Sequence, residues 1–174
     1  MTHALVAAPS LLRTGLLAAL LAAPLLAQAA PPACPLSPDA LKKVFGVAFA
    51  AGTPEPGMTG GSGCKYTSQG GNKKNNTDLS VSIFVEPPMG TPEMHRKMTM
   101  GPGHQFLPVA GDADKAVTVK HGGSVPPFPD VSYERGGYIV KLHLTGLDYL
   151  DDAKARDARI DEMNKKLLQL PRVP

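Results

Sequence analysis

The chain has 174 residues, of which 18 are Lys or Arg and 15 are Asp or Glu, so its formal net charge is +3. This near balance gives no electrostatic case for binding to nucleic acid or to an anionic membrane. Apolar residues make up 43% of the chain, which is enough for the core of one small domain.

Residues 1–29 are typical of a signal peptide. A weakly basic start precedes an apolar run over 16–26, and Ala-Gln-Ala at 27–29 supplies the small residues that signal peptidase accepts. The run is shorter than the roughly 20 residues that a membrane-spanning helix needs. An apolar helix packed within the fold is the alternative. The sequence therefore predicts a soluble periplasmic or secreted protein with a single domain over 30–174.

The chain has two cysteines, Cys34 and Cys64. In an exported protein they allow one intramolecular pairing, and the compartment favours the oxidised form. Closing a loop of about 30 residues stabilises a fold by roughly 3.5 kcal/mol in the chain-entropy model. A zinc or copper site is the alternative, but neither cysteine has a histidine beside it. We therefore expect a disulfide between Cys34 and Cys64.

A short helix is predicted at 38–45. Ser37 can cap its N-terminus, and proline suits the first helical position. Leu41, Val44 and Phe45 lie about one turn apart and would form its buried side. The segment 52–63 that follows is rich in Gly, Pro and Thr, so we expect a loop there.

Strands are predicted at 64–68 and 79–86. Apolar residues occupy every second position from the start of the second strand, which is the pattern of a half-buried strand. The sequence Thr91-Pro-Glu then opens a second helix that runs to about Met100. A further short strand is predicted at 117–120 from the same alternation.

A β-hairpin is predicted around Gly136 and Gly137. Two glycines in succession suit a two-residue turn, because both central residues of such a turn need a positive φ. This turn would pair apolar residues with apolar ones and polar residues with polar ones. The expected pairs are Arg135 with Tyr138, Tyr133 with Val140, Val131 with Leu142, and Ser132 with Lys141.

The last predicted helix follows a cluster of aspartates, which we expect to cap it: Asp148, Asp151 and Asp152. Its apolar side would carry Ile160, Met163, Leu167 and Leu170. Helices and strands therefore alternate along the chain, with tight hairpins and without repeated βαβ crossovers. We expect an α+β fold in which an antiparallel sheet has helices packed on one face.

A run of methionine and histidine around the second helix suggests a copper site. Thioether and imidazole groups suit Cu(I), and an exported protein can meet copper. The candidate ligands are Met89, Met94, His95, Met98, Met100 and His104. The simpler interpretation is that Met94 and Met98 lie on the buried side of the helix, with His95, Arg96 and Lys97 in solvent. We favour the simpler interpretation and expect no bound metal or cofactor.

No set of residues predicts catalysis. A hydrolase needs a nucleophile, a base and a residue that orients the base. His121 and Ser124 are the one close Ser/His pair, and no nucleophile-elbow motif surrounds them. His143 falls on the same strand face as Lys141, where we expect an exposed residue. We therefore expect no enzyme, and a hydrolase at His121 and Ser124 is the less favoured alternative.

Several short motifs resemble a group of small exported bacterial proteins and lipoproteins of unknown function. They are Cys34-Pro-Leu, Val44-Phe-Gly, Gly63-Cys-Lys-Tyr, Val109-Ala-Gly-Asp-Ala and the segment 133–144. The resemblance implies an α+β domain with one disulfide and implies no activity. Lipoproteins of the group carry an aliphatic residue three positions before the first cysteine, and Pro31 stands there in this chain.

We therefore expect a non-catalytic module that binds a protein or a small-molecule ligand in the cell envelope. The sequence predicts no contact with nucleic acid and no membrane span after cleavage of the signal peptide. A periplasmic Cu(I)-binding protein that uses the Met/His run over 89–104 is the alternative.

Overall fold

The computed structural model describes residues 34–72, 77–101, 103–122, 126–148 and 152–173, so the predicted signal peptide lies outside the described residues. In chain order, the elements of the described residues are α1 (Pro38–Phe45), β1 (Thr53–Pro56), β2 (Ser62–Thr67), β3 (Ser80–Glu86), α2 (Pro92–Met100), β4 (Gln105–Pro108), β5 (Val117–Lys120), β6 (Asp130–Arg135), β7 (Tyr138–Thr145) and α3 (Ala153–Leu168). Within this part of the chain, no helix is long and apolar enough to cross a membrane.

The strands form one antiparallel sheet in the order β1-β2-β3-β7-β6-β5-β4. The central strands β3, β7 and β6 lie side by side, and each is longer than the edge strands β1 and β4. The predicted α+β class and antiparallel sheet are confirmed.

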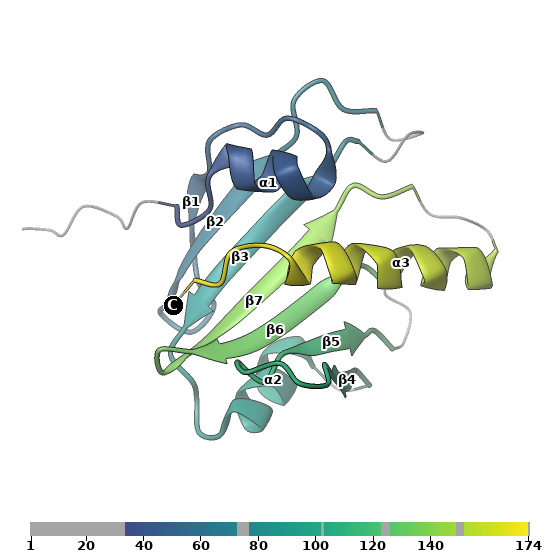
Figure 1. Cartoon of the computed structure of the whole chain (residues 1–174). Helices are drawn as coiled ribbons and strands as arrows, with labels where there is room; N and C mark the ends of the chain where they lie inside the picture. Colours follow the sequence, from purple (N-terminus) through teal and green to yellow (C-terminus); the bar gives the residue numbers. More distant parts are fainter. Residues whose placement is uncertain (1–33, 73–76, 102, 123–125, 149–151, 174) are drawn as a thin grey trace, which may run out of the picture.

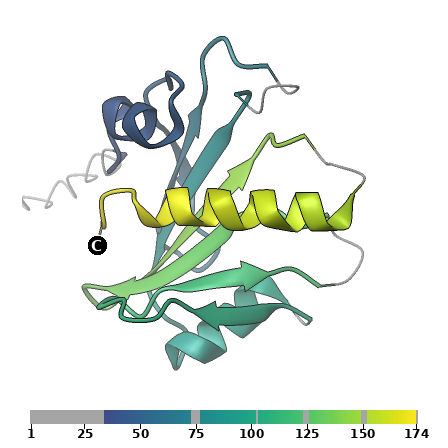
Figure 2. The ribbon, with the colours of Figure 1, turned by 45° about the vertical axis from the view of Figure 1, so that its right-hand side comes forward.

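The helices lie on both faces of the sheet (Figures 1 and 2). α1 and α3 cover one face, and α3 contacts β6, β7 and α1. α2 lies against the opposite face, near β5 and β6 (Figure 2). The sequence pattern predicted all the helices on one face. α2 differs because its inner side carries polar residues that pair with polar residues of the sheet, as described below.

The main core lies between the sheet and the layer of α1 and α3. Successive residues of a strand point to opposite faces, so alternate residues of β3, β6 and β7 fill this core. The side chains that the strands contribute are Val81, Ile83, Val131, Tyr133, Val140, Leu142 and Leu144. The helices contribute Leu41, Phe45, Met163 and Leu167, and Leu170 follows α3. The predicted buried sides of α1 and α3 are confirmed, apart from Val44 and Ile160, which are half-buried.

Each helix begins at a side-chain cap that the sequence predicts. The hydroxyl groups of Ser37 and Thr91 accept hydrogen bonds from the backbone N–H of the third residue that follows, at 3.1 and 3.2 Å. A carboxylate oxygen of Asp152 caps α3 in the same way, at 2.6 Å. Proline occupies the first position of α1 and of α2. These caps satisfy N–H groups that have no partner within the helix.

The hairpin of β6 and β7 has the predicted register. All four expected pairs are present, and Gly136 and Gly137 have φ values of 59° and 82°. Since both values lie in the left-handed region, the two glycines provide a turn whose twist matches that of the strands.

Two edge strands were not predicted. Residues 53–56 form β1, so the expectation of a loop over the whole of 52–63 was wrong for this part. β1 has the sequence Thr-Pro-Glu-Pro, and proline lacks the N–H of a ladder hydrogen bond, so such a segment carries no strand signal and is tolerated at an edge. β4 lies at the other edge and is equally short, at four residues.

Cys34 and Cys64 form the predicted disulfide, with their Cα atoms 5.6 Å apart. Cys64 lies in β2, so the bond joins the segment before α1 to the sheet. A hydrogen bond from the Leu36 N–H to the Tyr66 hydroxyl, 2.9 Å long, lies beside it. The start of the described chain is therefore held to β2 at two points.

Candidate functional site

The face of the sheet opposite the main core is unusually polar. In an antiparallel pair, residues that are directly opposite share a face, and here His143 faces Ser82 on β3 and Asp130 on β6. Lys141 lies opposite Ser132 on the same face, and Glu86 at the end of β3 belongs to it as well. α2 covers part of this face.

A buried ion pair lies at the centre of the interface between α2 and the sheet. The Lys141 Nζ is 2.5 Å from the Glu86 Oε2, and both side chains are 3% exposed or less. The His95 Nε2 lies 3.2 Å from the same carboxylate oxygen, and the Met58 N–H donates to the other oxygen at 2.8 Å. The ring of His95 is completely buried. The contact between His95 and Glu86 therefore ties α2 to the sheet.

The ionisation states in this cluster follow from its contacts. Burial raises the pKa of Glu86, but the Lys141 ammonium and the hydrogen bonds to the carboxylate outweigh it, so the pKa lies below its usual range. Burial lowers the pKa of His95, and Glu86 opposes this effect only in part. His95 Nδ1 accepts a hydrogen bond from the Met89 N–H at 3.2 Å. His95 is therefore neutral, with its proton on Nε2, which donates to Glu86.

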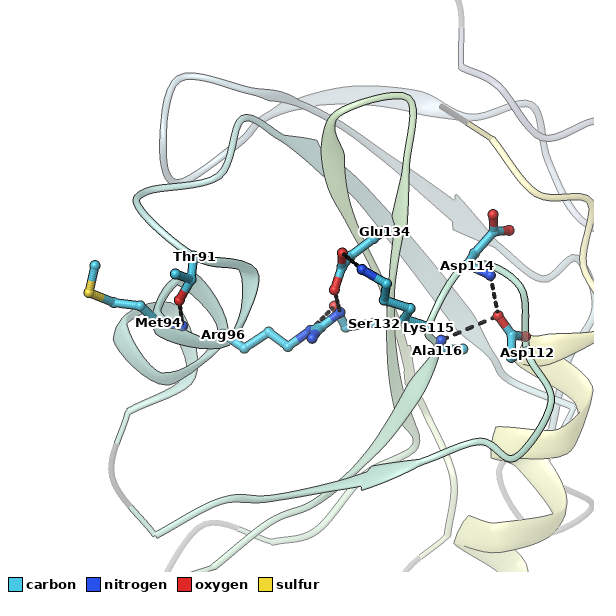
Figure 3. Close-up of polar contacts among 9 residues, drawn as sticks. All are labelled: Thr91, Met94, Arg96, Asp112, Asp114, Lys115, Ala116, Ser132 and Glu134. Atoms are coloured by element: carbon cyan, nitrogen blue, oxygen red, sulfur yellow. Dashed lines mark hydrogen bonds and ion pairs between the residues drawn. The ribbon is translucent and has the colours of Figure 1, made fainter.

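Arg96 anchors the same side of α2 at a second point (Figure 3). Its Nε donates to the Ser132 hydroxyl at 3.3 Å, and its Nη2 lies 3.3 Å from a carboxylate oxygen of Glu134. Lys115 approaches the other oxygen of Glu134, also at 3.3 Å. Arg96 is only 7% exposed, and the carboxylate of Glu134 compensates its charge within the protein.

A cleft of about 290 Å³ lies beside this network, between the start of α2 and the turn of the β6–β7 hairpin. The charged groups in its walls are paired with one another: Lys115 with Glu134, and Arg135 with Asp114 at 3.1 Å. Tyr138 contributes an aromatic ring to the wall. Because the opposite charges are matched within the cleft, it has no excess of either sign with which to select a charged ligand.

The outer side of α2 exposes two methionines among polar residues. Met94 and Met98, one turn apart, are 47% and 61% exposed. Together with Thr91, Glu93 and Lys97 they line an open hollow of about 450 Å³. We call these five residues the methionine surface. In Figure 3, Met94 points away from the sheet while Arg96 points toward it.

The expected orientation of α2 was therefore wrong. Met94 and Met98 were predicted to be buried, with His95 and Arg96 in solvent, and the structure has the opposite arrangement. Hydrogen bonds and ion pairs to Glu86, Ser132 and Glu134 decide the orientation, and the sequence of the helix alone does not reveal them. The prediction for Lys97 is confirmed, since its side chain is 64% exposed.

The candidate copper ligands do not meet at one point. Met94 and Met98 lie on the outer side of α2, whereas His95 is on the inner side with both ring nitrogens engaged. His104 precedes β4, where its Nδ1 accepts a hydrogen bond from the Gly122 N–H at 3.2 Å. Met94 and Met98 line the same hollow, whereas Met89 precedes α2 and Met100 is its last residue.

The remaining polar cluster surrounds Asp130. The carboxylate is 1% exposed, and its Oδ2 lies 3.4 Å from His121 Nε2 and 3.2 Å from His143 Nδ1. Neither contact has the alignment of a good hydrogen bond. The ring of Phe128 packs on His121, with 4.0 Å between the ring centroids. The proposed partner of His121, Ser124, lies outside the described residues.

This cluster and the other acidic groups have no geometry suited to a metal ion. Among the residues that the structure describes, no group of three or more His, Cys, Asp or Glu side chains is placed to hold one. His143 was expected to be exposed, but only 22% of its side chain is accessible, because Asp130 and the rings of Phe84 and Phe128 lie against it. It does share a face with Lys141, as predicted.

Comparison with models of protein families gave no match, and comparisons with curated proteins and with solved structures gave none either.

Proposed function

We propose that this protein is an extracytoplasmic, non-catalytic binding module, and that it binds an apolar segment of a partner protein on the methionine surface. The predicted signal peptide at 1–29 supports the location. The Cys34–Cys64 disulfide is compatible with it, since such bonds persist in oxidising compartments. The resemblance to small exported bacterial proteins points to the same compartment.

The observation that carries the proposal is the polarity of α2. A helix on the surface of a globular protein normally buries its apolar side and exposes its polar side. α2 buries His95 and Arg96 and exposes Met94 and Met98. Burying charged or polar groups costs free energy, and apolar side chains that stay exposed to water contribute no hydrophobic stabilisation to the fold. This combination is expected where a second molecule covers the exposed side.

The side chains of the surface suit an apolar partner. Methionine is unbranched and polarizable, so a pair of methionines can adapt to side chains of different shapes. The one ion pair of the surface joins Glu93 and Lys97 at 2.6 Å, and it leaves the surface without net charge. Contact with the partner would therefore depend on apolar area, with Glu93 and Lys97 at its rim.

A photo-crosslinking residue at position 97 tests the proposal in a cell-envelope extract of the source organism. We expect a discrete adduct with one protein, identified by mass spectrometry, that is lost in the Met94→Ser/Met98→Ser variant. The same photo-reactive residue at the exposed Lys154 is the control, because Lys154 belongs to α3, and α3 lies on the other side of the sheet from α2. Equal adducts from both positions, or an adduct that survives the double substitution, would contradict the proposal.

Binding of Cu(I) is the second candidate function, and one observation favours it: the thioethers of Met94 and Met98 lie on the same exposed side of α2. Titration of the purified protein with Cu(I) against a chelator such as bicinchoninate separates the two functions. Tight binding that is lost in Met94→Leu/Met98→Leu would favour copper, because leucine keeps the apolar surface and removes the ligands.

A further inference from the structure

The methionines of the described chain differ widely in access to solvent. Met58, Met98, Met94 and Met89 are 71%, 61%, 47% and 37% exposed, whereas Met163 is 7% exposed in the core. Oxidation of a thioether requires an oxidant to reach the sulfur, so exposure governs which methionines react. Two of the exposed sulfurs, those of Met94 and Met98, lie together on the outer side of α2.

We propose that Met94 and Met98 form a reversible oxidation site that switches the methionine surface between an apolar and a polar state. The oxidant is a peroxide. The sulfur lone pair attacks one peroxide oxygen and the O–O bond breaks, so that the sulfoxide keeps this oxygen and the other leaves as water. Sulfur loses two electrons and the peroxide gains them. A methionine sulfoxide reductase reverses the change: its dithiol is oxidised to a disulfide, and the sulfoxide oxygen leaves as water.

The contacts of α2 confine the effect to the surface. His95 and Arg96 hold the helix to the sheet through nitrogen and oxygen atoms, and no methionine sulfur takes part in these contacts. A sulfoxide on the outer side therefore leaves the anchor intact. Oxidation of Met163 would instead place a polar group in the core and disturb its packing.

The consequence is a loss of affinity for apolar molecules without unfolding. A sulfoxide oxygen is a strong hydrogen-bond acceptor. An apolar molecule that covered it would exclude water and offer no hydrogen-bond donor in its place. The effect on partner binding rests on the proposed function, whereas the oxidation and the change in surface polarity do not.

Peptide mapping by mass spectrometry after brief exposure of the folded, disulfide-bonded protein to hydrogen peroxide tests the first step. We expect Met94 and Met98 to be oxidised on the order of tenfold faster than Met163, and this difference to vanish in urea. Rates for Met94 and Met98 that equal the rate for Met163 in the folded protein would overturn the proposal.

Retention on a phenyl column tests the second step. We expect peroxide to shorten the retention of the wild-type protein and of Met58→Leu, and to shorten that of Met94→Leu/Met98→Leu much less. An equal shift in the double variant would overturn the proposal. Unchanged retention of an oxidised wild-type protein that its circular dichroism spectrum shows to be folded would overturn it as well. Neither measurement needs the partner protein, so failure of the crosslinking experiment remains a separate result.

Discussion

Lys141 of β7 and Glu86 of β3 form an ion pair between two neighbouring strands, on the face of the sheet that α2 covers. Lys141 lies opposite Phe84 in the ladder of β3 and β7, so Glu86 is its diagonal neighbour on the same face. The distance from Nζ to Oε2 is 2.5 Å, and neither side chain reaches solvent to any extent. His95 of α2 adds its ring to the same carboxylate. The pair therefore links the central strands to the helix that carries the methionine surface.

Glu86→Gln should destabilise the protein strongly. The substitution keeps the size of the side chain but leaves the buried Lys141 ammonium without its counter-charge. Removing one partner of a buried ion pair costs about 3–5 kcal/mol. Urea unfolding at pH 7 measures the loss. Glu93→Gln is the matched control, because Glu93 pairs with Lys97 in solvent and its loss should change stability little. Equal effects of the two substitutions would show that the buried pair does not hold α2 in place.

The stability of the protein should fall with acidification in two steps. His95 has a lowered pKa in the fold, so the unfolded chain binds more protons below about pH 6.5, and stability decreases as the pH falls through that region. The pKa of Glu86 is lowered as well, so its contribution is present above about pH 4.5 and decreases below it.

His95→Gln tests the first step, because glutamine keeps a hydrogen-bonding side chain and does not titrate. Urea unfolding between pH 7.5 and pH 5 should give a smaller loss of stability for the variant than for the wild type. The two proteins should then show similar further losses below about pH 4.5. A wild-type protein whose stability increases as the pH is lowered from 7.5 to 5 would contradict a neutral, buried His95. So would a variant whose stability has the same dependence on pH as that of the wild type.

The main core could be predicted from the sequence because its signals are local. Alternation predicts β3, and the paired glycines set the register of β6 with β7, so the pattern of residues alone assigns Val131, Tyr133 and Val140 to one face. The caps Ser37 and Thr91 likewise act on residues three positions away. Such signals need no knowledge of which strand lies beside which.

The candidate site could not be predicted in the same way, because its contacts join distant parts of the chain. Arg96 meets Ser132, which is 36 residues away, and His95 meets Glu86 across the turn into α2. One local sign was present: Lys141 stands between the apolar residues Val140 and Leu142 in a central strand, where a charge needs a partner. The position of Lys141 predicts a buried polar contact, but it does not indicate which strand or helix provides the partner.

Removal of the disulfide should lower stability by about 3.5 kcal/mol, as expected for a cross-link between residues 30 apart. Cys34→Ser/Cys64→Ser in urea unfolding at pH 7 measures this loss, and reduction of the wild-type protein should produce a loss of similar size. Alkylation of the unfolded, unreduced wild-type protein should modify neither cysteine. A free thiol in this control, or a loss below about 1 kcal/mol, would count against the role of the bond in holding the N-terminal segment to β2.

Asp130→Asn should destabilise the protein in a way that depends on pH. Burial raises the pKa of Asp130, but the charge of His143 and the contacts with His121 and His143 outweigh it, so the pKa lies below its ordinary value of 3.8. The ionised carboxylate therefore contributes stability above this pH and loses the contribution as the pH falls through the lowered value. Asparagine carries no charge and has one carbonyl oxygen in place of the carboxylate, so the polar contacts with His121 and His143 weaken, at a cost of about 1–3 kcal/mol near pH 7.

Urea unfolding of both proteins between pH 7 and pH 2.5 tests this expectation, since the difference in stability should be largest near neutral pH and should narrow below pH 3.8. Asp157→Asn on α3 is the control: its carboxylate is 55% exposed, and its loss should have little effect at any pH. A constant difference in stability between the wild type and Asp130→Asn over the whole pH range would contradict this expectation. It would mean that the shape of the side chain, and not its charge, accounts for the contribution of Asp130 to stability. Asp130, His121 and His143 would then stabilise the face of the sheet opposite the main core by packing alone.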